Sequence, residues 1–226
     1  MKRYNIFNNI HKGLRACLYD CANAVQQSDF NDPAQAALVM GKLSELIEMF
    51  GKHATTEDEF ILPIVMEYEP SVVTVFHDEH RKDEEISFRL RYLIHRFSGC
   101  REDGDRETAW EELAIAFIEF MVFNLNHMAK EEDILNRILW RYYPDEQLHQ
   151  HTKKIVAAQE PRMIALTSRW MIRGLNNSEI LSWYRSVKNH ASDTAFQEMM
   201  ALAEAELGRE RWSQLQMHLC DGAMVA

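Results

Sequence analysis

Three pairs of histidine and glutamate recur along the chain at one spacing, four residues. They are His53 with Glu57, His80 with Glu84, and His127 with Glu131. Side chains four residues apart lie on the same face of a helix, one turn from each other. An imidazole and a carboxylate on an apolar helix face are costly to bury unless they bind something. Because each pair falls on a separate predicted helix, a shared metal site is the simplest explanation of the repetition.

The third pair lies near the end of the most apolar stretch of the chain, Trp110 to Trp140. The face that carries His127 and Glu131 also carries apolar side chains at Ala116, Phe120, Phe123, Ile134 and Ile138. This spacing is typical of the inward side of an amphipathic helix. We therefore predict that the pair points into the protein, where its polar atoms need a ligand.

Four long amphipathic segments hold these pairs and are separated by short turns. They cover about residues 4–27, 33–63, 72–97 and 106–142. Asp32 is expected to cap the second helix before Pro33, and Pro63 to kink or end it. Short links between long helices favour an antiparallel, up-down four-helix bundle. In that arrangement the imidazoles of His11, His53, His80 and His127 reach a similar depth, which a shared metal site requires.

After residue 142 the helical segments become shorter. Amphipathic stretches are predicted at about 144–158, 161–172, 178–190, 194–206 and 209–219, with Asn177 or Ser178 as the cap of the third. The spacing of histidine and glutamate does not recur there. We expect two domains, a bundle at residues 1–142 with the metal site and a helical extension at residues 143–226 packed on it.

Composition supports an all-α fold and limits the partners. Apolar residues make up 46% of the chain, enough for a core, and only 8 Gly and 5 Pro are present. Acidic residues outnumber basic ones, 35 to 25, giving a formal net charge of −10. Nucleic acids and anionic membrane surfaces attract basic proteins, so neither is expected as a partner.

The sequence also predicts a cytoplasmic location. The amino terminus has no apolar stretch of signal-peptide length, and the densest apolar stretch, residues 114–123, is too short to span a bilayer. The four cysteines, Cys17, Cys21, Cys100 and Cys220, have no CxxC spacing. Free thiols in a reducing compartment are the expected state.

Imidazole nitrogen and carboxylate oxygen suit iron, manganese or zinc. The candidate ligands are His11, His53, Glu57, His80, His127 and Glu131. Four histidines and two glutamates are enough for two ions, with the glutamates bridging them. Two alternatives stay open: His77 competes with His80 as the ligand from the third helix, and Glu84 is a further candidate ligand.

The order and spacing of these residues resemble the hemerythrin-like (HHE cation-binding) domain family. The resemblance covers about residues 1–142 and includes the sequence Phe60-Ile61-Leu62-Pro63 after Glu57, and Glu79-His80 in the third helix. It implies a hemerythrin-like four-helix bundle with two iron ions joined by an oxide or hydroxide bridge. In that centre Glu57 and Glu131 would bridge the irons, and His11, His53, His80 and His127 would be terminal ligands.

One departure from the family affects the predicted function. Oxygen-carrying hemerythrins have a second histidine one turn after the histidine of the third helix, where this chain has Glu84. We therefore expect a di-iron protein that binds or reacts with O2, NO or peroxide in sensing, stress defence or iron handling. The alternative is a metal-stabilised regulatory module without catalysis, which binds a protein partner or a second copy through its carboxy-terminal region. The sequence does not decide whether the protein is an enzyme.

Overall fold

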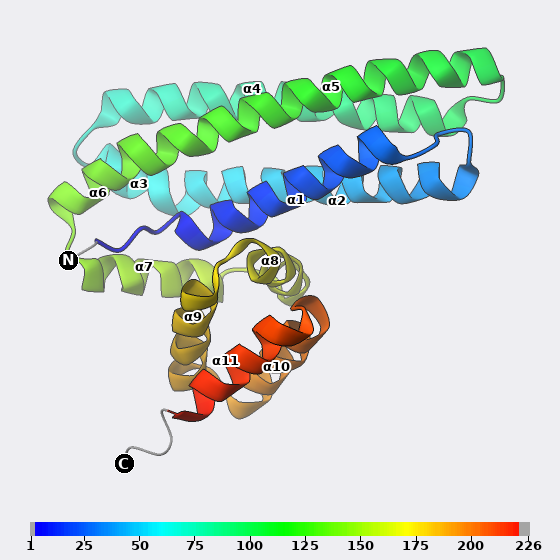
Figure 1. Ribbon diagram of the computed structural model, residues 1–226. Helices are drawn as coiled ribbons and strands as arrows, with labels where there is room; N and C mark the ends of the chain where they lie inside the picture. Colours follow the sequence, from blue (N-terminus) through cyan, green and yellow to red (C-terminus); the bar gives the residue numbers. More distant parts are fainter. Residues whose placement is uncertain (1–2, 222–226) are drawn as a thin grey trace. The chain divides into compact units, whose positions relative to one another are not determined.

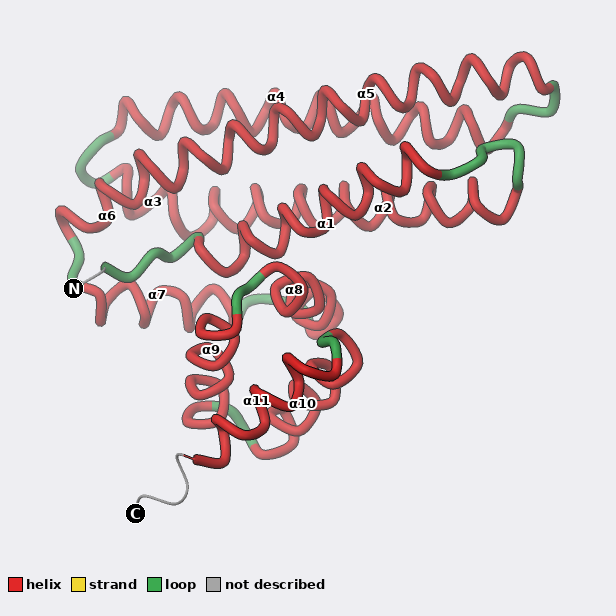
Figure 2. Tube along the Cα trace, viewed as in Figure 1, coloured by secondary structure: helices red, strands yellow, loops and turns green. Residues whose placement is uncertain are grey.

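The computed structural model describes residues 3–221, apart from the side chains of Asp103, Cys220 and Asp221, and is drawn in Figure 1. Helices joined by short loops make up this part of the chain, and it contains no β-strand (Figure 2). The predicted all-α fold is therefore confirmed. None of the helices among these residues is both long enough and apolar enough to span a membrane.

Contacts between residues divide the chain into two units. The first comprises the described residues up to Asn8 together with Cys17–Gln159, and the second comprises Asn9–Ala16 and the chain from Glu160 onward. Helix α1 (Asn8–Gln27) contributes residues to both units. Each unit has its own cluster of buried apolar side chains.

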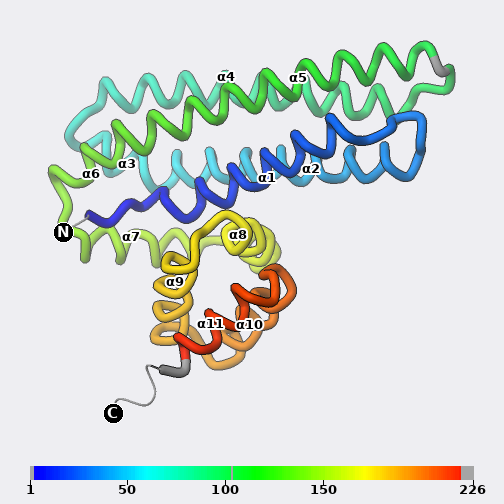
Figure 3. Tube along the Cα trace, viewed as in Figure 1, coloured from blue at the N-terminus to red at the C-terminus, as the bar shows by residue number. Residues whose placement is uncertain are grey.

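The first unit is a helical bundle. Its long helices are the part of α1 from Cys17, α2 (Pro33–Thr56), α4 (Pro70–Gly99) and α5 (Asp103–Lys130), which alternate in direction along the chain (Figures 1 and 3). The shorter helices are α3 (Leu62–Met66), α6 (Asn136–Tyr142) and α7 (Asp145–Ala157). As predicted, α2 begins at Pro33, and the side chain of Asp32 caps it by accepting hydrogen bonds from Ala34 N and Gln35 N.

Two π-helical turns interrupt the bundle helices. The first, η1 (Glu57–Ile61), joins α2 to α3, and the second, η2 (Glu131–Leu135), joins α5 to α6. Helical structure thus continues through Pro63, which lies in the first turn of α3, where a proline is tolerated. Each π turn adds one residue to the helical turn and shifts the inward face. Ile134, predicted to point inward, is therefore 39% exposed, whereas Leu135 is fully buried.

Helix α7 belongs to the first unit, so the division between units falls at residue 159 rather than after residue 142. Leu148 of α7 is buried in one cluster with Ile61 and Leu62. The imidazole Nε2 of His151 lies 2.6 Å from the carbonyl oxygen of Phe60. These contacts attach α7 to the η1–α3 segment, and the sequence pattern gave no sign of them.

The second unit contains α8 (Pro161–Gly174), α9 (Asn177–His190), α10 (Asp193–Glu206) and α11 (Arg209–Asp221). Its core includes Tyr184, which is fully buried and donates a hydrogen bond to the carbonyl of Met199 at 2.8 Å. Asn176, rather than the predicted Asn177 or Ser178, caps α9, because its side chain and that of Glu179 form a capping box. A Cβ atom at Gly174 would lie 2.3 Å from the carbonyl oxygen of Lys12, so α8 and the start of α1 cross closely.

Candidate metal centre

Four buried side chains from α4, α5 and the two π turns bring donor atoms together inside the first unit. They are Glu57, His80, His127 and Glu131, and one ligand atom from each lies within 4.8 Å of the others. The Nε2 atom of His127 is 2.9 Å from Oε1 of Glu131, and the Nε2 atom of His80 is 3.5 Å from Oε2 of Glu57. These four residues are between 0% and 8% exposed. Two imidazoles and two carboxylates therefore face one another away from water.

His53 adds a further imidazole on the side of α2. Its Nε2 atom lies 3.2 Å from Oε1 of Glu57, and its side chain is 9% exposed. Donor atoms of His53, Glu57 and Glu131 also lie within 4.8 Å of one another. Glu57 and Glu131 thus belong to two sets of donors, one that contains His53 and one that contains His80 and His127. Carboxylates shared in this way are suited to bridge two cations.

In two of the imidazoles, the ring nitrogen that faces away from the donor cluster lies at hydrogen-bond distance from a carboxylate. The Nδ1 atom of His80 is 2.7 Å from Oδ1 of Asp58, and the Nδ1 atom of His127 is 2.8 Å from Oε2 of Glu79. In metal sites an acceptor at one ring nitrogen fixes the tautomer and leaves the other nitrogen to bind the metal. With Nδ1 bonded to an acceptor, Nε2 of both rings faces the cluster of donors.

The electrostatics of the cluster favour positive charge. Burial alone would lower the pKa of His80, but the carboxylates of Glu131, Glu57 and Asp58 outweigh it and raise this pKa to about 11. Burial would also lower the pKa of His127. The carboxylates of Glu131, Glu57 and Glu79 outweigh this effect and raise the pKa to about 9. Without a metal ion, protons on these imidazoles balance the buried carboxylates.

The residues present fit a divalent metal centre. The Nε2 atoms of His80 and His127 are buried, and no hydrogen bond of acceptable geometry reaches them from the described residues. A buried polar atom in that state costs free energy unless a ligand satisfies it. Among the described residues, the donors in these groups are imidazole nitrogens and carboxylate oxygens, and no cysteine is included. Such donors match iron, manganese and zinc.

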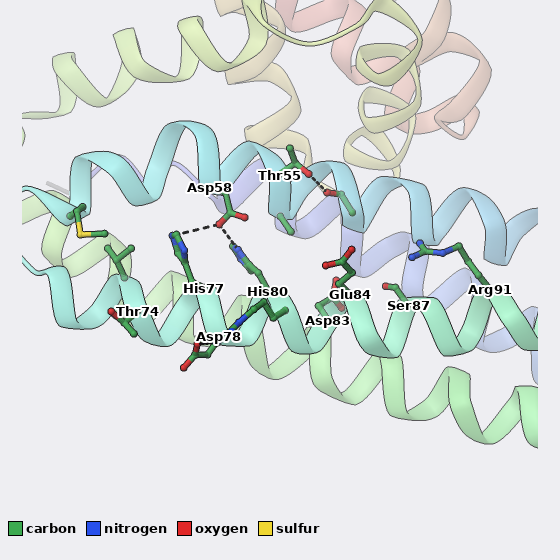
Figure 4. A pocket seen from close by; sticks show the side chains of 15 residues that line it. Thr55, Asp58, Thr74, His77, Asp78, His80, Asp83, Glu84, Ser87 and Arg91 are labelled. Atoms are coloured by element: carbon green, nitrogen blue, oxygen red, sulfur yellow. Dashed lines mark hydrogen bonds and ion pairs between the residues drawn. The ribbon is translucent and has the colours of Figure 1, made fainter.

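Three further candidate residues lie on α1 and α4. His11 is fully buried on α1, in the stretch Asn9–Ala16 that belongs to the second unit. His77 and Glu84 are exposed on α4 and are in neither set of donors within the first unit. Figure 4 shows both beside a groove, with Asp58 directed toward His77 as well as toward His80.

Three buried polar residues of α4 and α5 were not among the predicted site residues: Asp83, Ser87 and Asn124. Asp83 is 5% exposed and accepts a hydrogen bond from Nδ2 of Asn124 at 2.6 Å, and Ser87 is 2% exposed. Burial raises the pKa of Asp83, while the hydrogen bond from Asn124 opposes that shift. The spacing of two of them could have indicated a position near the ligands, because Asp83 follows His80 by three residues and Asn124 precedes His127 by three. Residues three apart on a helix lie on the same face.

Comparison with known proteins identifies the family. The model of the hemerythrin HHE cation binding domain matches residues 3–156, which is more than half of the chain and includes both π turns. No curated protein and no solved structure matches the chain. The all-α bundle, the buried histidines and glutamates and this match agree: the chain belongs to the hemerythrin HHE cation-binding domain family.

Proposed function

We propose that the protein holds two iron ions and uses them to bind or react with O2, NO or peroxide. The observation that carries the proposal is that Glu57 and Glu131 each belong to two sets of donor atoms. A single ion would not need two separate groups of histidines that share the same two carboxylates. Manganese or zinc would satisfy the same donors, so iron rests on the membership of the hemerythrin family.

The ligands divide between the two ions. His80 and His127 would serve one ion, and His53 would serve the other, with the two glutamates bridging. We propose His11 as the second imidazole for the ion at His53, because it is fully buried in α1 and stands where the family pattern has a ligand. Six protein ligands leave coordination positions open on a pair of ions that each prefer five or six ligands.

When bound, an iron pair supplies the electrons and the open position that reduction or reversible binding of a small oxidant requires. The protein contributes orientation and exclusion of water. Asp58 and Glu79 hold the Nδ1 sides of His80 and His127. The rings of Phe76 and Phe123, with centroids 5.8 and 6.1 Å from that of His127, place apolar surface beside this imidazole. Low polarity around buried charges strengthens their interaction with a metal ion.

The second candidate function is a metal-stabilised module without catalysis. It is supported by the second unit, whose separate core around Tyr184 includes four helices from residue 161 onward. A partner or a second copy of the chain would bind there, while the metal stabilises the bundle. Free thiols at Cys17, Cys21 and Cys100 support the proposed cytoplasmic location for either function.

Spectroscopy of the iron-loaded protein separates the two functions. The first predicts visible absorption from a ferric pair that disappears on anaerobic reduction and returns, or changes, when O2, NO or peroxide is added. Glu131→Gln should abolish this behaviour, and Asp133→Asn, an exposed residue of the same π turn, should retain it. A bound metal that none of these molecules affects would support the module instead.

A further inference from the structure

A groove of about 680 Å³ runs along the outside of α2, η1 and α4 in the first unit. Small residues form its α2 wall, Gly51, Ala54 and Thr55, which leaves room between the helices. Its α4 wall is one polar face, with His77, His80, Glu84, Ser87 and Arg91 at successive steps of three and four residues (Figure 4). At His80 the groove reaches a residue of the candidate metal centre.

The charges in the groove favour a cation. Four carboxylates line it, at Asp58, Asp78, Asp83 and Glu84, against two guanidinium groups, at Arg81 and Arg91. Arg81 is itself paired with Asp78. A cleft in which one sign of charge prevails concentrates ions of the opposite sign and speeds their association.

Asp58 connects the exposed part of the groove to the buried centre. Its Oδ1 atom lies 4.0 Å from Nε2 of His77 and 2.7 Å from Nδ1 of His80. His77 has a side chain that is 51% exposed, whereas that of His80 is 7% exposed. Because metal ions bind histidine nitrogen and carboxylate oxygen at about 2.0–2.2 Å, one ion fits between Nε2 of His77 and Oδ1 of Asp58.

Ser87 gives a second, independent sign of a polar occupant. Its Oγ atom is buried, lines the groove and has no hydrogen-bond partner among the described residues. A buried hydroxyl in that state is stabilised by a water molecule or by a ligand that brings its own water. A hydrated divalent ion offers such water molecules.

We propose that this groove is the route by which divalent metal ions load the centre, with His77 and Asp58 as the capture site at its outer part. The inference rests on the proposed metal-binding function and adds how the metal arrives. Glu84 raises the local concentration of cations at the mouth. His77 and Asp58 replace part of the water bound to the ion, and Asp58, which also contacts His80, connects the capture site to the centre. His77 and Glu84 are thus loading residues and are not ligands of the finished centre.

The rate of metal uptake tests the proposal. Metal-free protein is mixed with Fe²⁺ or Co²⁺ under anaerobic conditions, and uptake is followed by absorbance in stopped flow, with the final metal content measured afterwards. His77→Ala combined with Glu84→Gln should slow the initial uptake on the order of 10-fold at low salt. The final content should equal that of the wild type, and the difference should shrink as salt is added.

Matched controls lie on the same helix. His95→Ala and Glu85→Gln remove the same groups from exposed positions of α4 that do not line the groove, and they should load at the wild-type rate. Wild-type uptake rates in the double variant would overturn the proposed route and leave the metal centre intact. A lower final metal content in the double variant would also overturn it, because His77 or Glu84 would then be a resident ligand. A wild-type protein that binds neither ion would overturn the proposed function itself.

Discussion

Glu57 and Glu131 occupy equivalent positions, each as the first residue of a π-helical turn and each four residues after a buried or nearly buried histidine. The two segments lie on different helices of one bundle and share no loop. π turns inside helices are rare and occur mostly at functional sites. This repetition gives the candidate centre two carboxylates in similar local surroundings, and the proposed pair of ions would be bridged by them.

The first prediction concerns Glu131, one of the two carboxylates proposed to bridge the ions. Glu131→Gln keeps the shape of the side chain but removes the charge that both sets of donors share, so we expect the metal content to fall below half that of the wild type. The thermal stability gained on adding metal should fall with it, since binding energy is also folding energy. Metal analysis and melting temperature with and without metal measure both effects. Retention of the full metal content would show that Glu131 is not a ligand.

The second prediction concerns the carboxylate behind His127. Glu79→Gln weakens the acceptor at Nδ1, and loss of such a partner lowers metal affinity by about 10- to 100-fold. Competition with a chelator of known affinity measures the change. Asp133→Asn, which removes an exposed carboxylate paired with Arg137, is the control and should leave the affinity unchanged. Equal affinities in all three proteins would exclude this role for Glu79.

The third prediction concerns protons. The folded-state pKa of His80 is raised to about 11 and that of His127 to about 9, so both imidazoles are protonated at neutral pH without metal. Their protonation stabilises the metal-free fold fully below the unfolded pKa of about 6.5, and this stabilisation is lost as pH rises through 9 to 11. A metal ion must displace these protons, so its apparent affinity should rise with pH across this range. Calorimetry in buffers of different ionisation enthalpy should show about two protons released per chain at pH 7. Release of fewer than one would contradict the prediction.

The fourth prediction concerns the crossing of α8 with the start of α1 inside the second unit. Gly174→Ala places a Cβ atom against the backbone of Lys12, and overpacking of this kind costs about 1–3 kcal/mol. Gly41→Ala is the matched control, because a Cβ atom there meets nothing within 4 Å and the residue lies inside α2. It should be neutral or stabilising by up to about 1 kcal/mol. Urea unfolding of both variants checks the difference in sign, and equal effects would contradict the close crossing.

The sequence predicted the helices well because their apolar spacing, the cap at Asp32 and the Gly and Pro positions are local signals. It missed the shift from Ile134 to Leu135, since a π turn does not change composition and moves the inward face by one residue. The sequence also did not predict which carboxylates contact the Nδ1 atoms of His80 and His127. Asp58 and Glu79 are adjacent in sequence to other predicted site residues, and only the packing of helices reveals which imidazole each carboxylate meets.

The attachment of α7 to the first unit could not be predicted for a similar reason. The helix has one buried apolar residue, Leu148, and its contacts with Ile61 and Phe60 join segments about ninety residues apart in the sequence. Asp83 and Asn124 lie at helical spacing from His80 and His127, but nothing in the sequence distinguishes them from exposed polar residues, and only the structure shows both buried. Long-range packing, rather than local pattern, decides all of these features.

The most direct test of the account is an equilibrium titration of metal-free protein with Fe²⁺ under anaerobic conditions, with the bound iron counted per chain. The account predicts that binding stops at two ions per chain in the wild type, because two sets of donors share Glu57 and Glu131. Saturation at a single ion, or no binding, would contradict a two-metal centre in this bundle.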